Sequence, residues 1–201
     1  MARTVILGNG GYAKILACQA RGECLDKDDP IPDDADILIG VGDKDKRREL
    51  YLKHRGRVVG TVADTANFVA MNHGDGLHLM RGVIVQPGCA IGENVLINFG
   101  ALIDHDCNIG DHCVISPGAI LCGSVTLGEG CFVGAGAIII QEVTLPDETF
   151  VPAGTLVVGP DDFRKPVRDV RGSRAAKALG LEDTVLLEEH TFEKRVEHSP
   201  D

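Results

Sequence analysis

One histidine of the chain stands next to a carboxylate, in a pattern that suits proton transfer. Residues 102–107 read LIDHDC, which places His105 directly before Asp106. An adjacent carboxylate can fix which ring nitrogen carries the proton, and it stabilises the imidazolium that forms when a second proton arrives. His105 is therefore our candidate for a general base, and Asp106 for its partner.

The elements that would position this pair come from a six-residue repeat. Stepping six residues at a time from Val85, thirteen consecutive positions hold only Ile, Leu or Val. The residue two places earlier is small each time, and turn-forming residues recur directly after the aliphatic position. This pattern predicts short strands with inward aliphatic side chains and a turn every six residues. The aliphatic positions are Val85, Ile91, Ile97, Ile103, Ile109, Ile115, Leu121, Leu127, Val133, Ile139, Leu145, Val151 and Val157.

Three such hexads predict one triangular coil of a parallel β-helix, in which each coil buries its inner side by stacking on its neighbours. Residues eighteen apart then lie in adjacent coils, about 4.8 Å apart along the axis. Gly123 follows His105 by this interval (123 − 105 = 18), and we predict that its backbone N–H can donate to a developing oxyanion. Four of the seven cysteines fall at the small inward position, where we expect buried structural thiols: Cys89, Cys107, Cys113 and Cys131.

The first sixty residues follow a different pattern. We expect a strand over 3–7, a helix to about residue 20, a short strand near 24–26, a second strand over 36–41, a charged helix over 44–54 and a third strand over 58–62. This order predicts a small α/β unit of the Rossmann-like βαβ type. It is too short for a full dinucleotide fold, so a mononucleotide fits its length.

A glycine turn, Gly8-Asn9-Gly10-Gly11, separates the first expected strand from the first helix. Such a turn lets the backbone approach a phosphate and points the N–H groups of the helix at it. A glycine turn without a ligand is the alternative. The predicted substrate-binding residues are Gly8, Gly10, Gly11, Asp26, Gly42 and Asp43.

The two halves together resemble a known family. The glycine turn, the strand end Ile-Gly-Val-Gly-Asp at 39–43, the hexapeptide repeat and the run His-acidic-Cys-x-Ile-Gly at 105–110 are similar to the bacterial sugar O/N-acyltransferases. The resemblance extends from residue 3 to about residue 160, and is nearest to the nucleotide-linked amino-sugar N-acetyltransferases of bacillosamine or perosamine synthesis.

The resemblance implies a left-handed β-helix and a homotrimer with acyl-CoA in the groove between neighbouring helices; the repeat alone shows neither. It implies an acetyl-CoA-dependent N-acetyltransferase for a nucleotide-linked amino sugar, of the 4-amino-4,6-dideoxy type, in surface-glycan biosynthesis. Direct attack would use His105 as general base, with Asp106 as its partner and Gly123 as oxyanion donor. The chain departs from the family at 158–163, where VGPDDF stands in place of a Gly-x-Pro-Ala-Lys segment near the coenzyme.

Composition excludes several other classes. The net charge of −10 argues against a nucleic-acid partner. No apolar stretch approaches the roughly 18 residues of a membrane helix, and the opening residues do not read as a signal peptide. The cysteines form no CxxC pairs, which favours a reducing cytoplasm and no metal site. The spacing of His105 and His112 also lacks the ligand pattern of a zinc-dependent carbonic anhydrase.

We therefore expect a nucleotide-sugar-binding α/β domain over 1–62, a β-helix acyltransferase domain over 63–160 and a C-terminal extension over 161–201 with one or two amphipathic helices. His112, in the hexad after His105, is the second candidate base and is expected as a solvated turn residue. An O-acetyltransferase for a sugar or another hydroxyl acceptor, and a non-catalytic protein that binds sugar nucleotides, are the alternative functions.

Overall fold

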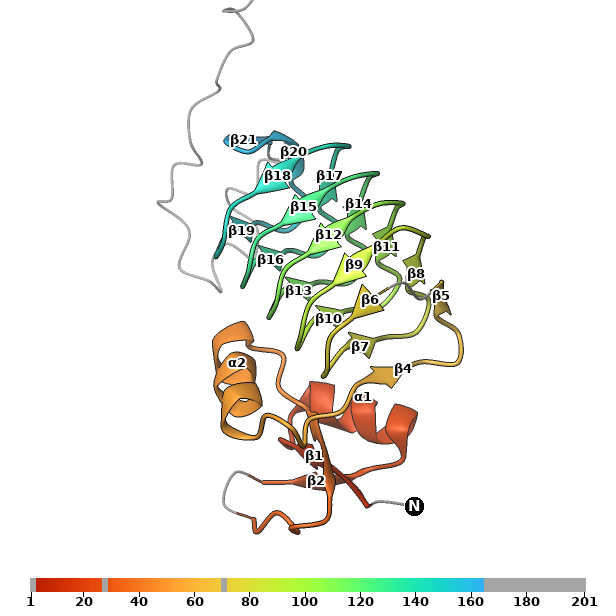
Figure 1. The fold of residues 1–201 in the computed structure, drawn as a ribbon, viewed down its shortest axis with the longest axis vertical. Coiled ribbons are helices and arrows are strands. Elements are labelled where there is room, and N and C mark those ends of the chain that lie inside the picture. Colours follow the sequence, from red (N-terminus) through yellow and green to blue (C-terminus); the bar gives the residue numbers. More distant parts are fainter. Residues whose placement is uncertain (1–2, 27–28, 70–71, 165–201) are drawn as a thin grey trace, which may run out of the picture. The chain divides into compact units, whose positions relative to one another are not determined.

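A computed structural model describes residues 3–26, 29–69 and 72–164. The N-terminal unit is a three-stranded parallel sheet with strand order β2-β1-β3 and two helices (Figure 1). Its elements are β1 (Thr4–Leu7), α1 (Gly11–Ala20), β2 (Glu23–Leu25), β3 (Asp36–Ile39) and α2 (Lys44–Lys53).

Local sequence explains where these elements begin and end. The apolar residues of β1 and β3 are buried, as strands covered by helices require. Asp43 caps α2 by accepting the Lys46 N–H at 3.0 Å, and Asp45 and Lys53 stand at the ends where each complements the helix dipole. The predicted third strand over 58–62 is not one element. Val58 makes a single parallel bridge to Ile37, and the chain then leaves the sheet to start the first coil.

The β-helix has three faces of parallel two-residue strands. The first face holds β4 (Thr61–Val62), β7 (His78–Leu79), β10 (Leu96–Ile97), β13 (Val114–Ile115), β16 (Phe132–Val133) and β19 (Phe150–Val151). The second holds β5 (Asn67–Phe68), β8 (Ile84–Val85), β11 (Leu102–Ile103), β14 (Ile120–Leu121), β17 (Ile138–Ile139) and β20 (Leu156–Gly159). The third holds β6 (Asn72–His73), β9 (Ala90–Ile91), β12 (Asn108–Ile109), β15 (Thr126–Leu127) and β18 (Thr144–Leu145).

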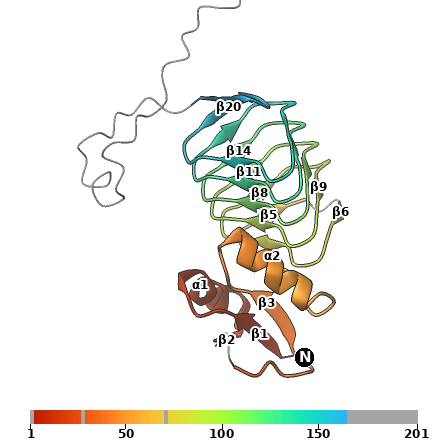
Figure 2. The ribbon, with the colours of Figure 1, turned by 90° about the vertical axis from the view of Figure 1, so that its left-hand side faces the viewer.

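Three corners join these faces (Figure 2). The α2 corner joins the third face to the first through turns 74–77, 92–95, 110–113, 128–131 and 146–149. The glycine corner joins the first face to the second through turns 80–83, 98–101, 116–119, 134–137 and 152–155. The dyad corner joins the second face to the third through turns 86–89, 104–107, 122–125 and 140–143. The dyad corner is therefore the one opposite the first face.

The core confirms the predicted register. Each of the thirteen aliphatic positions is at most 5% exposed, and neighbouring strands pair eighteen residues apart, as in Leu102 with Ile120. The four inward cysteines are buried and each thiol donates to a backbone carbonyl fifteen residues on, at 3.1–3.3 Å. Burial raises the pKa of the Cys107 thiol to about 12, so this side chain acts as a small apolar group.

The N-terminal unit packs on the first face and the α2 corner. The Tyr12 hydroxyl lies 2.7 Å from Nδ1 of His78 on β7. The guanidinium of Arg47 is fully buried and donates to the Ile39 carbonyl at 2.9 Å and the Gly76 carbonyl at 3.1 Å. One arginine of α2 thus ties together the sheet of the N-terminal unit and the first coil of the β-helix.

A row of ion pairs continues this contact along the α2 corner. Lys44 and Arg48 each lie 2.7 Å from Glu148, and Arg55 lies 2.7 Å from Glu93. The Tyr51 hydroxyl donates to Glu93 at 2.8 Å. Exposed pairs of this kind contribute about 0–1 kcal/mol each, so they add little to the stability of this contact.

The last coil ends in a hairpin. Strand β21 (Asp162–Arg164) pairs antiparallel with β20 and occupies the end of the second-face sheet. The helices predicted for the C-terminal extension lie beyond Arg164, outside the described residues. No helix in the described ranges is long and apolar enough to cross a membrane.

Candidate active site

The structure brings His105 and Asp106 into a hydrogen bond on the dyad corner. Nδ1 of His105 lies 2.8 Å from Oδ2 of Asp106, and the His105 backbone N–H donates to Oδ1 of Asp104 at 2.8 Å. The His105 and Asp106 side chains are 59% and 64% exposed. In a single chain the pair is therefore open to a substrate from outside the β-helix.

The two carboxylates change the basicity of the imidazole. The hydrogen bond to Asp106 raises the pKa of His105 above its usual 6.5, and the charge of Asp104 acts in the same direction. When Nδ1 donates its proton to Asp106, Nε2 keeps a free lone pair. This nitrogen is the atom that can take a proton from a nucleophile.

Gly123 lies directly against this ring. A Cβ atom at residue 123 would stand 2.8 Å from Cε1 and from Nε2 of His105, because the two turns are adjacent and the Ser124 N–H donates to the His105 carbonyl at 2.9 Å. Glycine at this position leaves room for the imidazole. Within the described part of the chain, the Gly123 N–H has no hydrogen-bond acceptor.

The predicted substrate-binding residues gather at the carboxyl ends of β1, β2 and β3. Gly8 has a φ of +118°, and a Cβ there would lie 3.1 Å from the Gly40 carbonyl oxygen, so the fold itself requires this glycine. Gly10 precedes α1 with a φ of −70°, and an added Cβ would meet nothing within 4 Å. The fold does not require glycine at residue 10, and no side chain of the described residues caps the N-terminus of α1.

Polar side chains surround this turn. The Asn9 amide hydrogen-bonds the Asp26 carboxylate, at the ends of β1 and β2. Gly42, like Gly11, has open space where a Cβ would stand. Asp43 caps α2 as described above, so its carboxylate has a structural partner already. The turn, Asp26 and residues 42–43 are together at one edge of a parallel sheet, where such sheets bind ligands.

His112 differs from the sequence prediction. It is 7% exposed rather than solvated, and its Nδ1 lies 3.0 Å from the Asn94 amide one coil earlier. Its ring meets the Tyr51 ring edge-on at 5.5 Å. The prediction was wrong because α2 covers this corner, which the repeat by itself does not reveal.

A family model and several solved structures indicate one family for this chain. Residues 106–141 match the family model "Bacterial transferase hexapeptide (six repeats)", whereas no curated protein sequence matches the chain. PerB from Caulobacter crescentus, in complex with CoA and GDP-perosamine, is 30% identical; the match covers 83% of this chain and 92% of that one, with a TM-score of 0.72. A variant of perosamine N-acetyltransferase from the same organism is 29% identical over 79% and 90% of the two chains, with a TM-score of 0.71.

The acetyltransferase domain of PglB from Neisseria gonorrhoeae is 25% identical over 83% of this chain and 94% of that domain, with a TM-score of 0.73. The 30% identity with PerB, over 83% of this chain and 92% of that one, decides the family. The chain belongs to the hexapeptide-repeat sugar N-acyltransferases. The stacked parallel strands fit the left-handed β-helix expected for such a chain.

Two features of this sugar N-acyltransferase were not visible in its sequence. Asp104 holds the backbone of His105, although its place directly before a turn is a usual one for an aspartate that caps a neighbouring N–H. A cluster of the buried Arg47 and His78 with the half-buried Tyr12 attaches the N-terminal unit to the β-helix. No spacing in the sequence signals it, because its members come from three separate elements.

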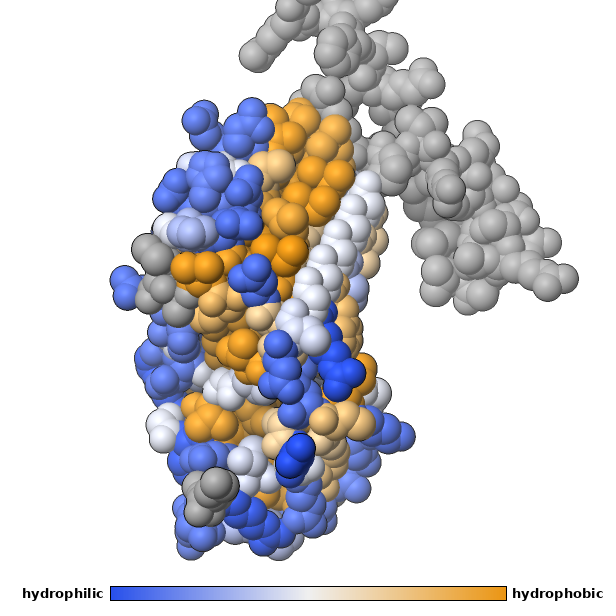
Figure 3. All heavy atoms as spheres, turned by 90° about the vertical axis from the view of Figure 1, so that its right-hand side faces the viewer, coloured by the Kyte–Doolittle hydropathy of each residue, from blue (hydrophilic) through white to orange (hydrophobic). Residues whose placement is uncertain are grey.

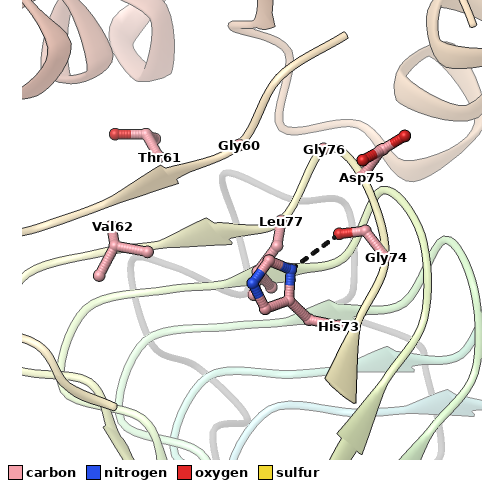
Figure 4. A pocket seen from close by; sticks show the side chains of 8 residues that line it. All are labelled: Gly60, Thr61, Val62, His73, Gly74, Asp75, Gly76 and Leu77. Atoms are coloured by element: carbon pink, nitrogen blue, oxygen red, sulfur yellow. Dashed lines mark hydrogen bonds between the residues drawn. The ribbon is translucent and has the colours of Figure 1, made fainter. Parts of the chain in front are cut away.

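Other hollows of this sugar N-acyltransferase do not coincide with the dyad. A cavity of about 220 Å³ lies between Gly60–Val62 and His73–Leu77 (Figure 4). Among the described residues that line it, the ionisable side chains are His73 and Asp75, and the cavity is smaller than the roughly 300–1,000 Å³ of usual ligand sites. No group of three or more metal-binding side chains occurs among the described residues.

Proposed function

We propose that the protein transfers the acetyl group of acetyl-CoA to the amino group of a nucleotide-linked amino sugar. The observation that carries this is the His105–Asp106 hydrogen bond, against Gly123, on an exposed corner of a sugar N-acyltransferase. Structures similar to this one hold CoA and GDP-perosamine. We infer further that the acceptor is a 4-amino-4,6-dideoxy sugar for surface-glycan synthesis.

The dyad would act as follows. Nε2 of His105 takes the proton from the amine as its nitrogen attacks the thioester carbonyl, and Asp106 stabilises the imidazolium. The Gly123 N–H donates to the tetrahedral oxyanion. When that intermediate collapses, the C–S bond breaks and the thiolate of CoA takes the proton from His105, which leaves the new amide and restores the neutral base.

The N-terminal unit would hold the nucleotide. The uncapped start of α1 leaves N–H groups available for a phosphate, and the glycine at residue 10 is explained by close approach of a ligand rather than by the backbone. Asp26, Gly42 and Asp43 would line the ribose and base. This is the role of a Rossmann-like unit, reduced to one mononucleotide.

The second face supports a homotrimer. Its outward strand positions form an aliphatic column, visible as a hydrophobic band in Figure 3, whereas those of the third face are small or polar. A continuous apolar strip at the surface, with Ile138 and Leu156 exposed, is typical of an interaction surface. The column consists of Ile84, Leu102, Ile120, Ile138 and Leu156.

A trimer would also complete the active site. The N-terminal unit contacts the first face and the α2 corner of its own chain, whereas His105 stands on the opposite corner beside the second face. A second copy seated on that face would cover the exposed dyad and bring its own sugar nucleotide to it. The groove between copies is the place we assign to acetyl-CoA. Seven free cysteines support a cytoplasmic location.

The decisive test is a screen of UDP-, GDP- and dTDP-linked 4-amino sugars with acetyl-CoA, following thiol release, with the matching 4-hydroxy sugars as controls. We expect turnover with an amino sugar only. His105→Ala should lower kcat by about 10²–10⁴, the usual contribution of a positioned base, and should leave both Kd values nearly unchanged. Turnover of hydroxyl acceptors alone, or near-normal kcat in His105→Ala, would reject the proposal.

A further inference from the structure

The dyad corner carries one glycine that its turns do not need. The third residue of each turn at this corner has a positive φ: +87° at Gly88, +59° at Asp106, +59° at Ser124 and +63° at Glu142. Three of these four residues are not glycine. A left-handed turn with φ near +60° is therefore compatible with a side chain at this position, so the turn type alone does not explain the glycine at residue 88.

The carboxylate of Asp106 explains the glycine at residue 88. Residue 106 lies one coil after residue 88 (106 − 88 = 18), and the Asp106 N–H donates to the Pro87 carbonyl at 3.1 Å. A Cβ at residue 88 would stand 2.0 Å from Oδ1 of Asp106 and 3.0 Å from its Cγ. The other oxygen, Oδ2, is the one that lies 2.8 Å from Nδ1 of His105.

We propose that Gly88 is a positioning residue for the dyad: the missing side chain leaves the space in which the Asp106 carboxylate reaches the His105 ring. Its consequence for catalysis rests on the proposed function, but its effect on the imidazole does not. The charges that face this ring come from Asp106 and Asp104 of its own turn. The turn before contributes Gly88 and the buried thiol of Cys89, which donates to the Asp104 carbonyl, and the turn after contributes Gly123.

The test compares Gly88→Ala with Gly56→Ala. Gly56 also has a φ of +87°, and nothing lies within 4 Å of its Cβ position, so both variants carry the same backbone strain. We expect similar losses of melting temperature. Only Gly88→Ala should lower the pKa of His105 toward 6.5, measured by NMR titration of its ring, because the displaced carboxylate no longer accepts from Nδ1. Its kcat should fall about tenfold or more.

A second background separates this role from a purely structural one. In Asp106→Ala there is no carboxylate to displace, so adding Gly88→Ala should change neither kcat nor the His105 pKa further. An unchanged His105 pKa in Gly88→Ala, or a full additional loss in the Asp106→Ala background, overturns the proposal. A His105 pKa that moves while activity does not would keep the positioning role and reject the function assigned to the dyad.

Discussion

At the dyad corner, a single hydrogen bond decides which nitrogen of His105 can act as a base. Asp106 accepts a hydrogen bond from Nδ1, so Nε2 keeps its lone pair free. The same bond raises the pKa of His105. The dyad therefore gains a stronger base, and in exchange that base is protonated over more of the neutral pH range.

Asp106→Asn should separate these two effects. Without the carboxylate the pKa of His105 falls, so the acidic limb of the kcat/KM profile, where the base becomes protonated, should move to lower pH. The plateau at high pH should fall, because the imidazolium loses its stabilising partner, though by less than in His105→Ala. The measurement is kcat/KM from pH 5 to 9. An acidic limb that stays in place would show that Asp106 does not act on this imidazole.

Residue spacing made part of this site predictable. In a β-helix, residues eighteen apart become neighbours, so Gly123 could be placed beside His105 from the sequence alone. The same rule gives no warning of what packs on a corner from outside. It could not show that α2 buries His112, or that the Asp106 carboxylate bends back over Gly88, because both depend on side-chain direction rather than on register.

Among the elements, the turn between β1 and α1 holds a glycine, Gly10, that its backbone does not require. Gly8 is required by its positive φ and its contact with Gly40, whereas Gly10 is not. Gly10→Val should therefore fold normally. It should raise the Kd and KM for the sugar nucleotide about tenfold or more, since a branched side chain would block the approach of a phosphate to the N–H groups of α1.

Calorimetry with sugar nucleotide and, separately, with acetyl-CoA checks this expectation. Acetyl-CoA affinity serves as the control within the same variant and should not change. Unaltered sugar-nucleotide affinity would assign the N-terminal unit another role.

The joint between the N-terminal unit and the β-helix should make stability depend on pH. His78 is fully buried, and burial together with the charge of Arg47 holds its pKa well below the usual 6.5. The unfolded chain then binds more protons than the folded one between the two pKa values. The contribution of this side chain is complete above about pH 6.5 and is lost progressively as the pH falls below it.

His78→Asn keeps an acceptor near the Tyr12 hydroxyl but removes the titration. It should cost about 1–3 kcal/mol at pH 8 through imperfect burial, and its urea midpoint should fall less steeply than that of the native protein from pH 6.5 to 5. His73→Asn, at an exposed histidine, is the matched control. Equal slopes in the His78→Asn variant and the native protein would mean that His78 does not contribute to the pH dependence of stability.

The elements themselves followed closely from the sequence. The order of strands and helices through residue 53 matches the prediction within two residues at most boundaries, because caps and buried runs are local signals. The expected strand over 58–62 was divided, since residues 61–62 pair with β7, a partner that only the coil geometry supplies. The secondary structure of that segment is therefore determined by long-range strand pairing rather than by local propensity.

At the scale of the whole molecule, the fold separates the two groups that the proposed reaction would bring together, the glycine turn and the dyad. One chain places its glycine turn on the side of the first face and its dyad on the opposite corner. A cyclic trimer repeats one head-to-tail contact three times, so each copy can supply its sugar nucleotide to the dyad of the next. Light scattering should accordingly give a trimer, and a stable monomer with full turnover would contradict the shared site.

Mixed trimers test that arrangement most directly. His105→Ala and Gly10→Val each impair one half of every site, and they should be nearly inactive alone at low sugar-nucleotide concentration. In a trimer refolded from an equal mixture, a shared site is intact when an unaltered glycine turn meets an unaltered dyad, which random assembly gives in roughly a quarter of cases.

Mixing His105→Ala with Asp106→Ala is the control, because both changes damage the same dyad and no intact site can form. Recovery of about a quarter of native activity in the first mixture and none in the second is the expected result. Equal inactivity in both mixtures would place the glycine turn and the dyad of each site on a single chain.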